Sequence, residues 1–402
     1  MKLTEPRLKV FQVSHPDDLP AHLQAIASSD MVGVDAERAS GFRYSHRAYL
    51  IQLSLKDRIL LIDPYELGFD GPWSSELASA LSGPLWILHS ATQDLPCLAE
   101  LDLKPSRLFD TELAARLTGA ERFGLSSLAE SLLSIELEKE HSAADWSKRP
   151  LTESMLNYAA LDVDILFDLH SSLSSLLREQ GKDAWAEQEF RHLLGFRAKP
   201  QPIEPWRSLP GMSKIKDKRA QQIGAGLWKR RDEIARERDV APGRLVPDRS
   251  IMAVVSAPPK TKAELAKNKQ FHGRASRELL KEWWQAIVES EALEITAPVL
   301  DSDHMPNHRN WERRFPDAHI RYTTLRPLVQ ARAEELNLAT EMLLTPDFLR
   351  RVCFAPANDF EQQLKDLGAR DWQIENVSPV IADGLRLAEA EIRSQAASPS
   401  EP

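Results

Sequence analysis

The stretch MVGVDAE at residues 31–37 decides the expected fold of this chain. Its apolar start, rich in valine, predicts a buried β-strand, with two acids at the strand's end. Because side chains alternate between the two faces of a strand, Asp35 and Glu37 are expected on the same face. Their carboxylate oxygens can therefore converge on one pair of ions.

Further apolar runs with strand character follow at residues 49–55, 59–62 and 85–88. The first two are separated by only three residues, 56–58, which is short enough only for a hairpin, so we expect these early strands to be antiparallel. Later strands alternate with helical patterns and should be parallel. A helix from about 152 to 178 is expected to close this block, which gives an α/β fold with a mixed sheet.

Beyond this block the chain changes character. Residues 195–206 contain Pro200, Pro202 and Pro205 and are typical of an extended linker. The patterns after the linker are helical, with few strand signals, and predict two all-α helical bundle domains. The helices are expected at 214–236, 250–255, 276–288, 325–337, 346–351 and 377–394, with an irregular segment near 298–316. The predicted domains are 1–195, 206–294 and 310–394, followed by a disordered tail at 395–402.

The composition is that of an ordinary globular protein, with 42% hydrophobic and 28% charged residues in 402. The N-terminus lacks a signal-peptide pattern, and no apolar run approaches the roughly 18 residues that a membrane helix needs. We therefore expect a cytoplasmic protein without membrane contact. The two cysteines, Cys97 and Cys353, lack the spacing of a zinc site or a disulfide framework and are expected to be reduced core residues.

The net charge of −9 hides an asymmetry along the chain. Residues 207–285 contain 19 Lys and Arg against 9 Asp and Glu, a local net charge of +10, so the rest of the chain carries −19. A basic segment in an acidic protein is typical of a nucleic-acid contact, although many charged runs are only solvated helix faces. Charge alone leaves both interpretations open.

Three more side chains of the first block have placements that suggest chemistry. Asp94 follows the strand that ends near residue 88, and a helix beginning near Thr92 would hold it above the end of the sheet, where open α/β sheets commonly place ligands. Tyr158 and Asp162 are four residues apart in a predicted helix and should project from one face. The neighbouring acids, Asp164 and Asp168, are expected only to face solvent.

The four candidate acids, Asp35, Glu37, Asp94 and Asp162, would repel one another strongly if they converged without cations. Hard divalent ions prefer oxygen ligands, and Mg²⁺ combines a few carboxylates with phosphate and water. Two such ions can stabilise both the attacking and the leaving oxygen of a phosphodiester displacement. Each acid alone is more often a cap or an exposed side chain, so their spacing by itself is weak evidence for a metal site.

Several ordered motifs of the first block resemble ribonuclease D. Three of them look like the exonuclease motifs of that family, and two more lie between the second and the third. The matching segments are VGVDAE (32–37) with LIQL (50–53), HSATQDL (89–95), FDTELAARL (109–117), DWSKRPL (145–151) and NYAALDV (157–163).

The resemblance implies an RNase H-like fold and an exonuclease of the class with four metal-binding acids. It assigns Asp35, Glu37, Asp94 and Asp162 as ligands of two divalent metal ions, Mg²⁺ or Mn²⁺. It also implies that Tyr158 orients the attacking water or helps to deprotonate it. Asn157 occupies the position at which a histidine subclass has its histidine, so the tyrosine subclass is favoured. Ala36 stands where many members have threonine, but it points away from the two acids.

Two other polar residues of the block are ambiguous. Gln52 contacts the terminal nucleotide by analogy with the family, although a glutamine satisfied within the sheet explains it equally well. Asp110 is a fifth acid near the others, but the resemblance gives it no ligand role, and we expect it to be structural.

The second block, 206–294, resembles the helical accessory domain shared by ribonuclease D and RecQ-type helicases, on residues 209–212, 228–232 and 246–248. The third block looks like a second, diverged copy. The implied activity is a metal-dependent 3′–5′ exoribonuclease that releases nucleoside 5′-monophosphates from RNA with a 3′ end, in the processing of tRNA or other stable RNA. A DNA-directed 3′–5′ exonuclease and a catalytically silent RNA-binding scaffold remain as alternatives, and recognition of the 2′-hydroxyl would separate RNA from DNA.

Overall fold

The computed structural model describes residues 2–137, 144–198, 200–296 and 305–397. Its N-terminal part is built on a six-stranded mixed sheet with the strand order β2-β5-β4-β3-β6-β7. The predicted α/β fold with a mixed sheet is therefore confirmed. The strands are β2 (Lys9–Val13), β3 (Met31–Arg38), β4 (Ala48–Ser54), β5 (Arg58–Ile62), β6 (Leu85–Leu88) and β7 (Leu108–Asp110).

The strands joined by short connections are antiparallel, and those separated by helices are parallel. β4 pairs antiparallel with both β3 and β5, whereas β6 pairs parallel with both β3 and β7, as predicted. β2, which the sequence patterns did not reveal, adds a parallel edge strand beside β5, and a second sheet joins β1 (Lys2–Leu3) to β8 (Glu136–Leu137). Every residue of β4 is buried, since the strand lies inside the sheet with both faces covered.

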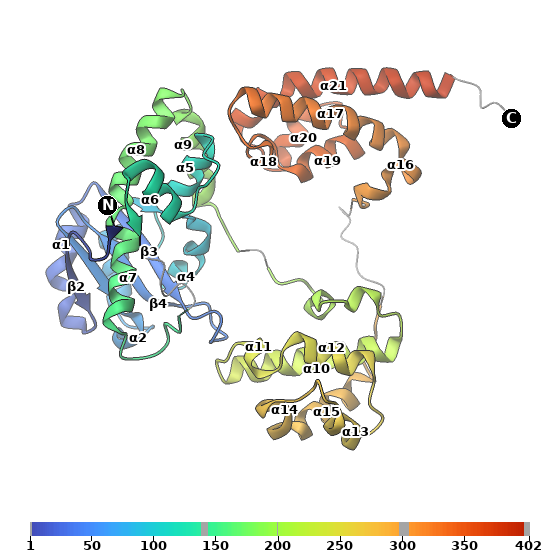
Figure 1. The fold of residues 1–402 in the computed structure, drawn as a ribbon, viewed down its shortest axis with the longest axis horizontal. Coiled ribbons are helices and arrows are strands. Elements are labelled where there is room, and N and C mark those ends of the chain that lie inside the picture. Colours follow the sequence, from blue (N-terminus) through green and yellow to red (C-terminus); the bar gives the residue numbers. More distant parts are fainter. Residues whose placement is uncertain (1, 138–143, 199, 297–304, 398–402) are drawn as a thin grey trace.

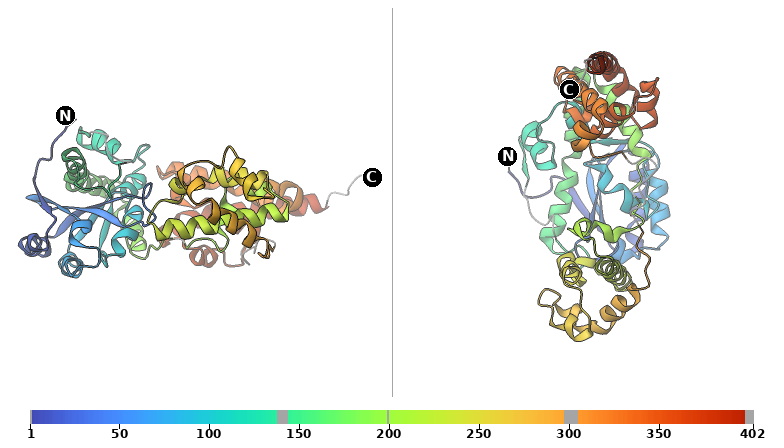
Figure 2. Two further views of the ribbon diagram at one scale, coloured as in Figure 1. Left: turned by 90° about the horizontal axis from the view of Figure 1, so that it is seen from below. Right: turned by 90° about the vertical axis from the view of Figure 1, so that its right-hand side faces the viewer.

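Helices cover both faces of the six-stranded sheet (Figure 2). One glycine is required by this packing, because a Cβ at Gly33 of β3 would collide with the Ser54 hydroxyl of β4 and press on Leu166. The helices of this part are α1 (Pro20–Ala27), α2 (Pro64–Leu67), α3 (Trp73–Leu81), α4 (Leu95–Ala99), α5 (Thr111–Leu117), α6 (Leu125–Leu133), α7 (Glu153–Asp164), α8 (Leu166–Glu179) and α9 (Asp183–Leu194).

The single helix expected from 152 to 178 is wrong, because the chain breaks between α7 and α8 at Ile165. The Arg7 guanidinium donates a hydrogen bond of 2.7 Å to the carbonyl of Asp164. That carbonyl would accept from the amide of residue 168 in a continuous helix, so the arginine replaces a helical bond at the break.

The second part is helical and has its own hydrophobic core, formed around Trp206, Ile223 and Trp283. Figure 1 shows this part in yellow, set apart from the sheet. Its helices are α10 (Lys218–Glu237), α11 (Pro242–Leu245), α12 (Asp248–Ser256), α13 (Lys262–Lys267), α14 (Arg274–Glu278) and α15 (Leu280–Ser290).

The loop between β3 and β4 reaches this second part. The Tyr44 hydroxyl donates to Asp232 at 3.0 Å, and its backbone amide donates to Asp239 at 3.1 Å. The amide of Ala241 donates to the carbonyl of Phe42 at 3.0 Å. The strand that carries Asp35 and Glu37 thus leads directly into the contact with α10.

The third part is also helical, but its core is continuous with that of the sheet domain. Trp185 of α9 stacks on Trp372, with ring centroids 4.9 Å apart and planes at 16°. The helices are α16 (Trp311–Arg314), α17 (Pro316–Glu335), α18 (Thr340–Leu343), α19 (Pro346–Phe354), α20 (Phe360–Asp366) and α21 (Asp371–Ala397). None of the helices in the described ranges has the length and apolar character that a bilayer span requires.

Two helices of this part are longer than predicted. α17 and α21 contain Pro327 and Pro379 in their interiors, where proline usually ends or kinks a helix. Val329 and Ile381, one turn or less beyond each proline, are buried, so tertiary packing outweighs the lost backbone bond. The predicted tail, 395–402, begins inside α21, and residues 398–402 lie outside the described ranges.

Candidate active site

Three of the four predicted acids meet where β3 and α7 lie side by side. One carboxylate oxygen each of Asp35, Glu37 and Asp162 lies within 4.8 Å of the others. The pleat of β3 places the first two on one face, and α7 packs against β3, β4 and β5 to bring the third. An ion bound by oxygen could take ligands from all three.

Asp94 lines the same cleft but enters it from a different kind of element. We expected a helix beginning near Thr92, and this is wrong: a 3-10 turn spans Ala91–Gln93, and α4 starts only at Leu95. Asp94 therefore lies between two short elements and is 5% exposed. Burial raises the pKa of Glu37 most, and the charge of Asp94 adds to that rise, although Asp94 falls outside the group of three carboxylates within 4.8 Å.

Asp110 explains how the turn before Asp94 is held. One of its carboxylate oxygens accepts from the amides of Glu112 and Leu113 and caps α5. The other oxygen accepts from the amide of Ala91 at 2.8 Å. All these contacts are with backbone amides, so the expectation that this fifth acid is structural is confirmed.

Tyr158 and Asp162 project from one face of α7, as their spacing predicted, and the tyrosine hydroxyl hydrogen-bonds the Asp162 carboxylate. The helix begins after Thr152, whose side chain accepts from the amide of Met155. Just upstream, Arg149 donates to Asp63, the residue after β5, at 2.7 Å. This anchor fixes the start of α7 relative to the sheet.

The cleft around these acids has a volume of about 560 Å³. Its walls include residues that sequence reasoning did not single out: Arg38 at the end of β3 and the segment 124–127 at the start of α6. Gly124 followed by an amphipathic run was the available signal for that helix start, but nothing in the sequence placed it beside β3. Its volume lies in the range that is typical of small-molecule binding sites.

Burial and mutual repulsion disfavour the charged carboxylates when no cation is bound. Burial raises the pKa of Asp35 to about 6, and burial together with Asp35, Asp162 and Asp94 raises that of Glu37 to about 10. The pKa values of Asp94 and Asp162 are raised well above the ordinary value, first by burial and then by Asp35. Such a set of acids can be fully ionised at neutral pH only if cations offset the repulsion.

The same environment acts on Tyr158. Burial, followed by the charges of Asp162 and Glu37, raises the pKa of its phenol. The hydroxyl therefore stays protonated near neutral pH without a bound cation, and in that state it acts as a hydrogen-bond donor.

The sequence also led to expectations for Gln52, Asp164 and the two cysteines. Gln52 is fully buried opposite Asp35, and its amide has no partner among the described groups, so a nucleotide contact stays a prediction. Asp164, expected to face solvent, is 2% exposed and accepts from the Arg7 backbone amide at 2.8 Å; that expectation was wrong. Cys97 and Cys353 are buried free thiols, as predicted.

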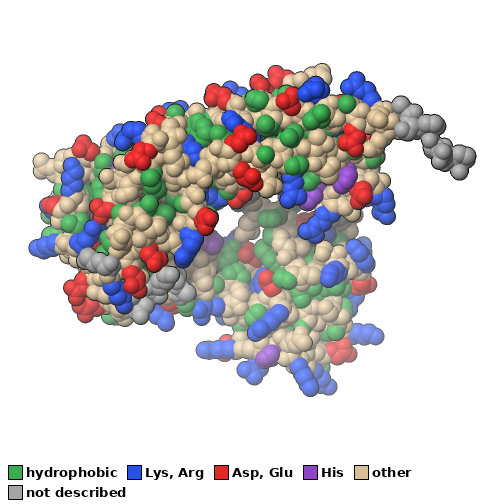
Figure 3. Space-filling model, turned by 45° about the horizontal axis from the view of Figure 1, so that its top comes forward, with side chains coloured by type: hydrophobic (Ala, Val, Ile, Leu, Met, Phe, Trp, Pro, Cys, Tyr) green, Lys and Arg blue, Asp and Glu red, His purple; other side chains and the backbone are tan. Residues whose placement is uncertain are grey.

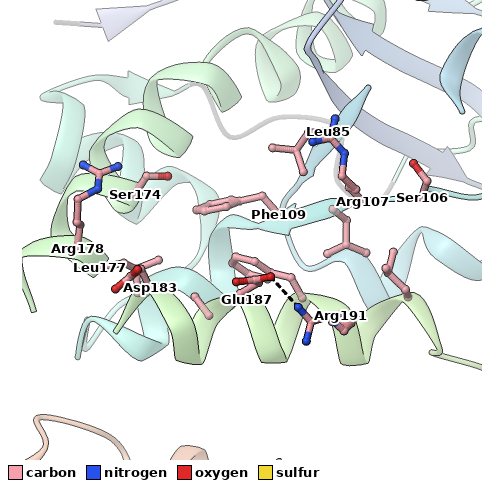
Figure 4. A pocket seen from close by; sticks show the side chains of 14 residues that line it. Leu85, Ser106, Arg107, Phe109, Ser174, Leu177, Arg178, Asp183, Glu187 and Arg191 are labelled. Carbon is pink, nitrogen blue, oxygen red and sulfur yellow. Dashed lines mark hydrogen bonds and ion pairs between the residues drawn. The ribbon is translucent and has the colours of Figure 1, made fainter. Parts of the chain in front are cut away.

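A second hollow, of about 480 Å³, lies elsewhere on the sheet domain between β7, α8 and α9 (Figure 4). Phe109 and Phe190 are among its lining residues, and Glu187 is paired there with Arg191 at 2.6 Å. Its lining holds no group of converging acids comparable to that beside β3. The converging carboxylates therefore belong to the cleft beside β3.

The predicted basic segment lies on the second part. Lys and Arg side chains protrude from this part in the space-filling view (Figure 3). Lys214, Lys216 and Lys218 are all exposed near the start of α10. These cations are accessible to a polyanion, which is compatible with phosphate binding.

Three family models match successive parts of the chain. Residues 10–178 match a 3′-5′ exonuclease domain, residues 221–287 an HRDC domain, and residues 304–385 a 3′ to 5′ exonuclease C-terminal domain. The first match contains the whole acidic cleft. The second lies within the helical part with the basic segment.

Individual relatives agree with these matches. Ribonuclease D of Zymomonas mobilis is 30% identical over 283 residues, which cover 68% of this chain and 71% of the relative. A crystal structure of a protein from Bifidobacterium adolescentis superposes with a TM-score of 0.88 at 34% identity and covers 96% of this chain and 99% of its own. Escherichia coli RNase D, described as an exoribonuclease involved in structured RNA processing, has the same fold, with a TM-score of 0.69 at 22% identity over 94% of this chain and 99% of its own.

Proposed function

Because this chain belongs to the ribonuclease D family and is a 3′–5′ exoribonuclease, we propose that its acidic cleft hydrolyses the last phosphodiester bond of RNA with two bound divalent cations, Mg²⁺ or Mn²⁺. The residues proposed to hold the cations are Asp35, Glu37, Asp94 and Asp162. The observation that carries this proposal is the convergence of three of these carboxylates within 4.8 Å, with the fourth in the same cleft.

The donor set fits such cations. All the proposed ligands are carboxylate oxygens, which hard divalent ions prefer. The raised pKa values of Asp35 and Glu37 express an electrostatic cost that bound cations would remove. When bound, the cations would polarise the scissile phosphate, lower the pKa of the attacking water and stabilise the leaving oxygen.

The remaining side chains have supporting roles in the proposal. Tyr158 donates its hydroxyl hydrogen toward Asp162, at the edge of the carboxylate group, where a phenol can orient the attacking water. Its raised pKa favours orientation over proton abstraction. Asp110 acts indirectly, because it fixes the turn that precedes Asp94.

The proposed substrates are tRNA precursors and other stable RNA with an unpaired 3′ end, and the proposed place of action is the cytoplasm. The basic segment at 207–285, within the second domain proposed at 206–294, would bind phosphates upstream of the terminus. The involvement of Escherichia coli RNase D in structured RNA processing supports this substrate class. The domain proposed at 310–394 packs on the sheet domain and serves its stability.

The experiment that tests the function uses 5′-labelled RNA and DNA strands of equal sequence with Mg²⁺, Mn²⁺ or chelator. The expected result is a ladder that shortens by one nucleotide at a time from the 3′ end, requires metal and forms faster on RNA. Internal cuts, or the same ladder in chelator, would contradict the proposal. Equal rates on RNA and DNA would contradict its substrate class.

A further inference from the structure

His89 is the residue directly after β6, and it lines the acidic cleft without a role in the proposed metal site. Its Nδ1 atom lies 2.9 Å from the hydroxyl oxygen of Thr111. That hydroxyl donates its single hydrogen to the carbonyl of Leu88 at 3.1 Å, because a carbonyl can only accept. The Thr111 oxygen must therefore accept from His89, and Nδ1 carries the ring hydrogen.

The assignment of Nδ1 leaves Nε2 as an acceptor with a free lone pair. Burial lowers the pKa of His89 to about 4, so the ring is neutral at the pH of an ordinary assay. No described group hydrogen-bonds Nε2, and it is not among the polar atoms sealed from solvent. The lone pair is therefore available to a donor that enters the cleft.

The backbone around His89 is held as firmly as its ring. Ser90 adopts a left-handed conformation with φ of 58°, and its amide donates to Asp110 at 3.3 Å. The amide of Ala91 donates to the same carboxylate at 2.8 Å. Nε2 of His89 is thus held in position before the substrate arrives, which lowers the entropic cost of binding.

We propose that Nε2 of His89 accepts a hydrogen bond from a ribose hydroxyl of the 3′-terminal nucleotide. Phosphate oxygens near the metal ligands can only accept, so they cannot pair with this lone pair. Base N–H groups differ from one nucleotide to the next, whereas an exonuclease must process each in turn. Ribose hydroxyls are the donors that all RNA nucleotides share, and the 2′-hydroxyl also distinguishes RNA from DNA. This inference rests on the proposed function of the cleft.

The test compares wild type with His89→Leu on three RNA strands: unmodified, 2′-deoxy at the last nucleotide only, and 3′-deoxy at the last nucleotide only. Single-turnover rates are measured at saturating Mg²⁺. On unmodified RNA, the loss of the acceptor should slow cleavage by about fivefold to thirtyfold, as for one hydrogen bond left unmade. On the strand that lacks the bonded hydroxyl, the cleavage rates of wild type and His89→Leu should agree within about twofold. The hydrogen bond is already absent from that strand, so removing its acceptor has no further effect.

Two further variants separate the hydrogen bond from a general loss of structure. His89→Gln can place an amide oxygen near the position of Nε2. This variant should retain most of the discrimination, which is the ratio of the rate on unmodified RNA to the rate on the strand that lacks the bonded hydroxyl. Thr111→Val removes the partner of Nδ1 without touching the nucleotide and should weaken the discrimination. His170→Leu, a half-buried histidine of α8 outside the cleft, is the control and should leave the rate ratios unchanged. Thermal melting of each protein establishes that it is folded.

The outcomes distinguish this inference from the function on which it rests. A variant effect that disappears on one of the two deoxy strands supports the inference and identifies the hydroxyl. If His89→Leu or His89→Gln slows all three strands by the same factor, the histidine acts on structure or on bound water, and the inference is overturned while the exonuclease function stands. If wild type shortens none of the strands, the proposed function itself fails.

Discussion

Glu189 of α9 holds the guanidinium of Arg370 through two hydrogen bonds of 2.6 Å, one to each carboxylate oxygen. It also accepts from the Trp372 indole at 2.7 Å. Because the glutamate is only 3% exposed, this ion pair fixes the third part on the sheet domain through a desolvated contact.

Removal of the glutamate should loosen that contact strongly. Glu189→Ala leaves Arg370 without its anion and should cost about 3 to 5 kcal/mol of stability. Glu187→Ala removes an exposed partner of Arg191 on the same helix and should cost at most about 1 kcal/mol. Urea unfolding gives the two values, and hydrogen exchange of α21 locates the change. Equal effects of the two substitutions would show that the buried pair contributes no more than the surface pair.

The two residues on α7 should differ in what their loss affects. Asp162→Ala removes a proposed ligand, so metal affinity and turnover should fall together. Tyr158→Phe keeps the ring but deletes the hydroxyl, so kcat should fall by about 10² to 10⁴ while metal affinity stays nearly unchanged. Titration calorimetry and single-turnover cleavage measure both properties, with Tyr65→Phe as an exposed tyrosine control. Near-normal cleavage by Tyr158→Phe would make this residue a packing residue only.

Stability without metal should fall as pH rises. The folded pKa values of Asp35 and Glu37, about 6 and about 10, lie above the ordinary values that these acids have when unfolded. Between the unfolded and the folded pKa the unfolded chain loses protons that the folded chain retains, so the folded state becomes less stable with rising pH. In chelator, the melting temperature should therefore be lower at pH of about 8 than at about 5.5.

Two comparisons test whether the buried carboxylates cause this fall in stability with pH. Mg²⁺ should raise the melting temperature more at the higher pH, because only ionised carboxylates bind it. Glu37→Gln should be more stable than wild type in chelator near pH 8, whereas Glu121→Gln, an exposed acid, should behave as wild type. A wild-type melting temperature that rises with pH in chelator has the wrong sign for this explanation.

The basic segment should contribute to affinity without affecting chemistry. Replacing Lys214, Lys216 and Lys218 by alanine should weaken RNA binding, and the log-log salt slope should fall by about 0.7 for every phosphate that is no longer neutralised. Cleavage at saturating RNA should be unchanged, because these residues lie outside the cleft. Fluorescence anisotropy at several salt concentrations measures the slope, with Lys104→Ala as an exposed control in the sheet domain. An unchanged slope would remove these three lysines from the RNA contact.

Local periodicity predicted those features of the site that depend on one element. The period of a strand placed Asp35 and Glu37 together, and the turn of a helix placed Tyr158 above Asp162. The convergence of β3, α7 and the turn before Asp94 is a long-range property, and only the resemblance to a family supplied it. Local patterns alone did not contain that information.

The wrong predictions also arise from contacts between residues that are distant in the sequence. Asp164 is charged, and it was expected in solvent because its partner, Arg7, lies 157 residues away. The expected helices began at 325 and 377, two residues before Pro327 and Pro379, yet both helices begin earlier, at Pro316 and Asp371, because packing keeps them continuous through the prolines. In each case a distant contact outweighs a local preference.

The joint between α9 and α21 also has a consequence for protein synthesis. A ribosome adds about 5 to 20 residues per second, so α9 waits on the order of 10 to 40 s before the roughly 180 residues up to Trp372 have followed it. During that interval Trp185 and the buried carboxylate of Glu189 lack their covers. A chain that stops early keeps this apolar surface exposed, and chaperones or proteases can recognise it. The finished enzyme thus differs from such truncated products at the surface of α9 that Arg370 and Trp372 cover.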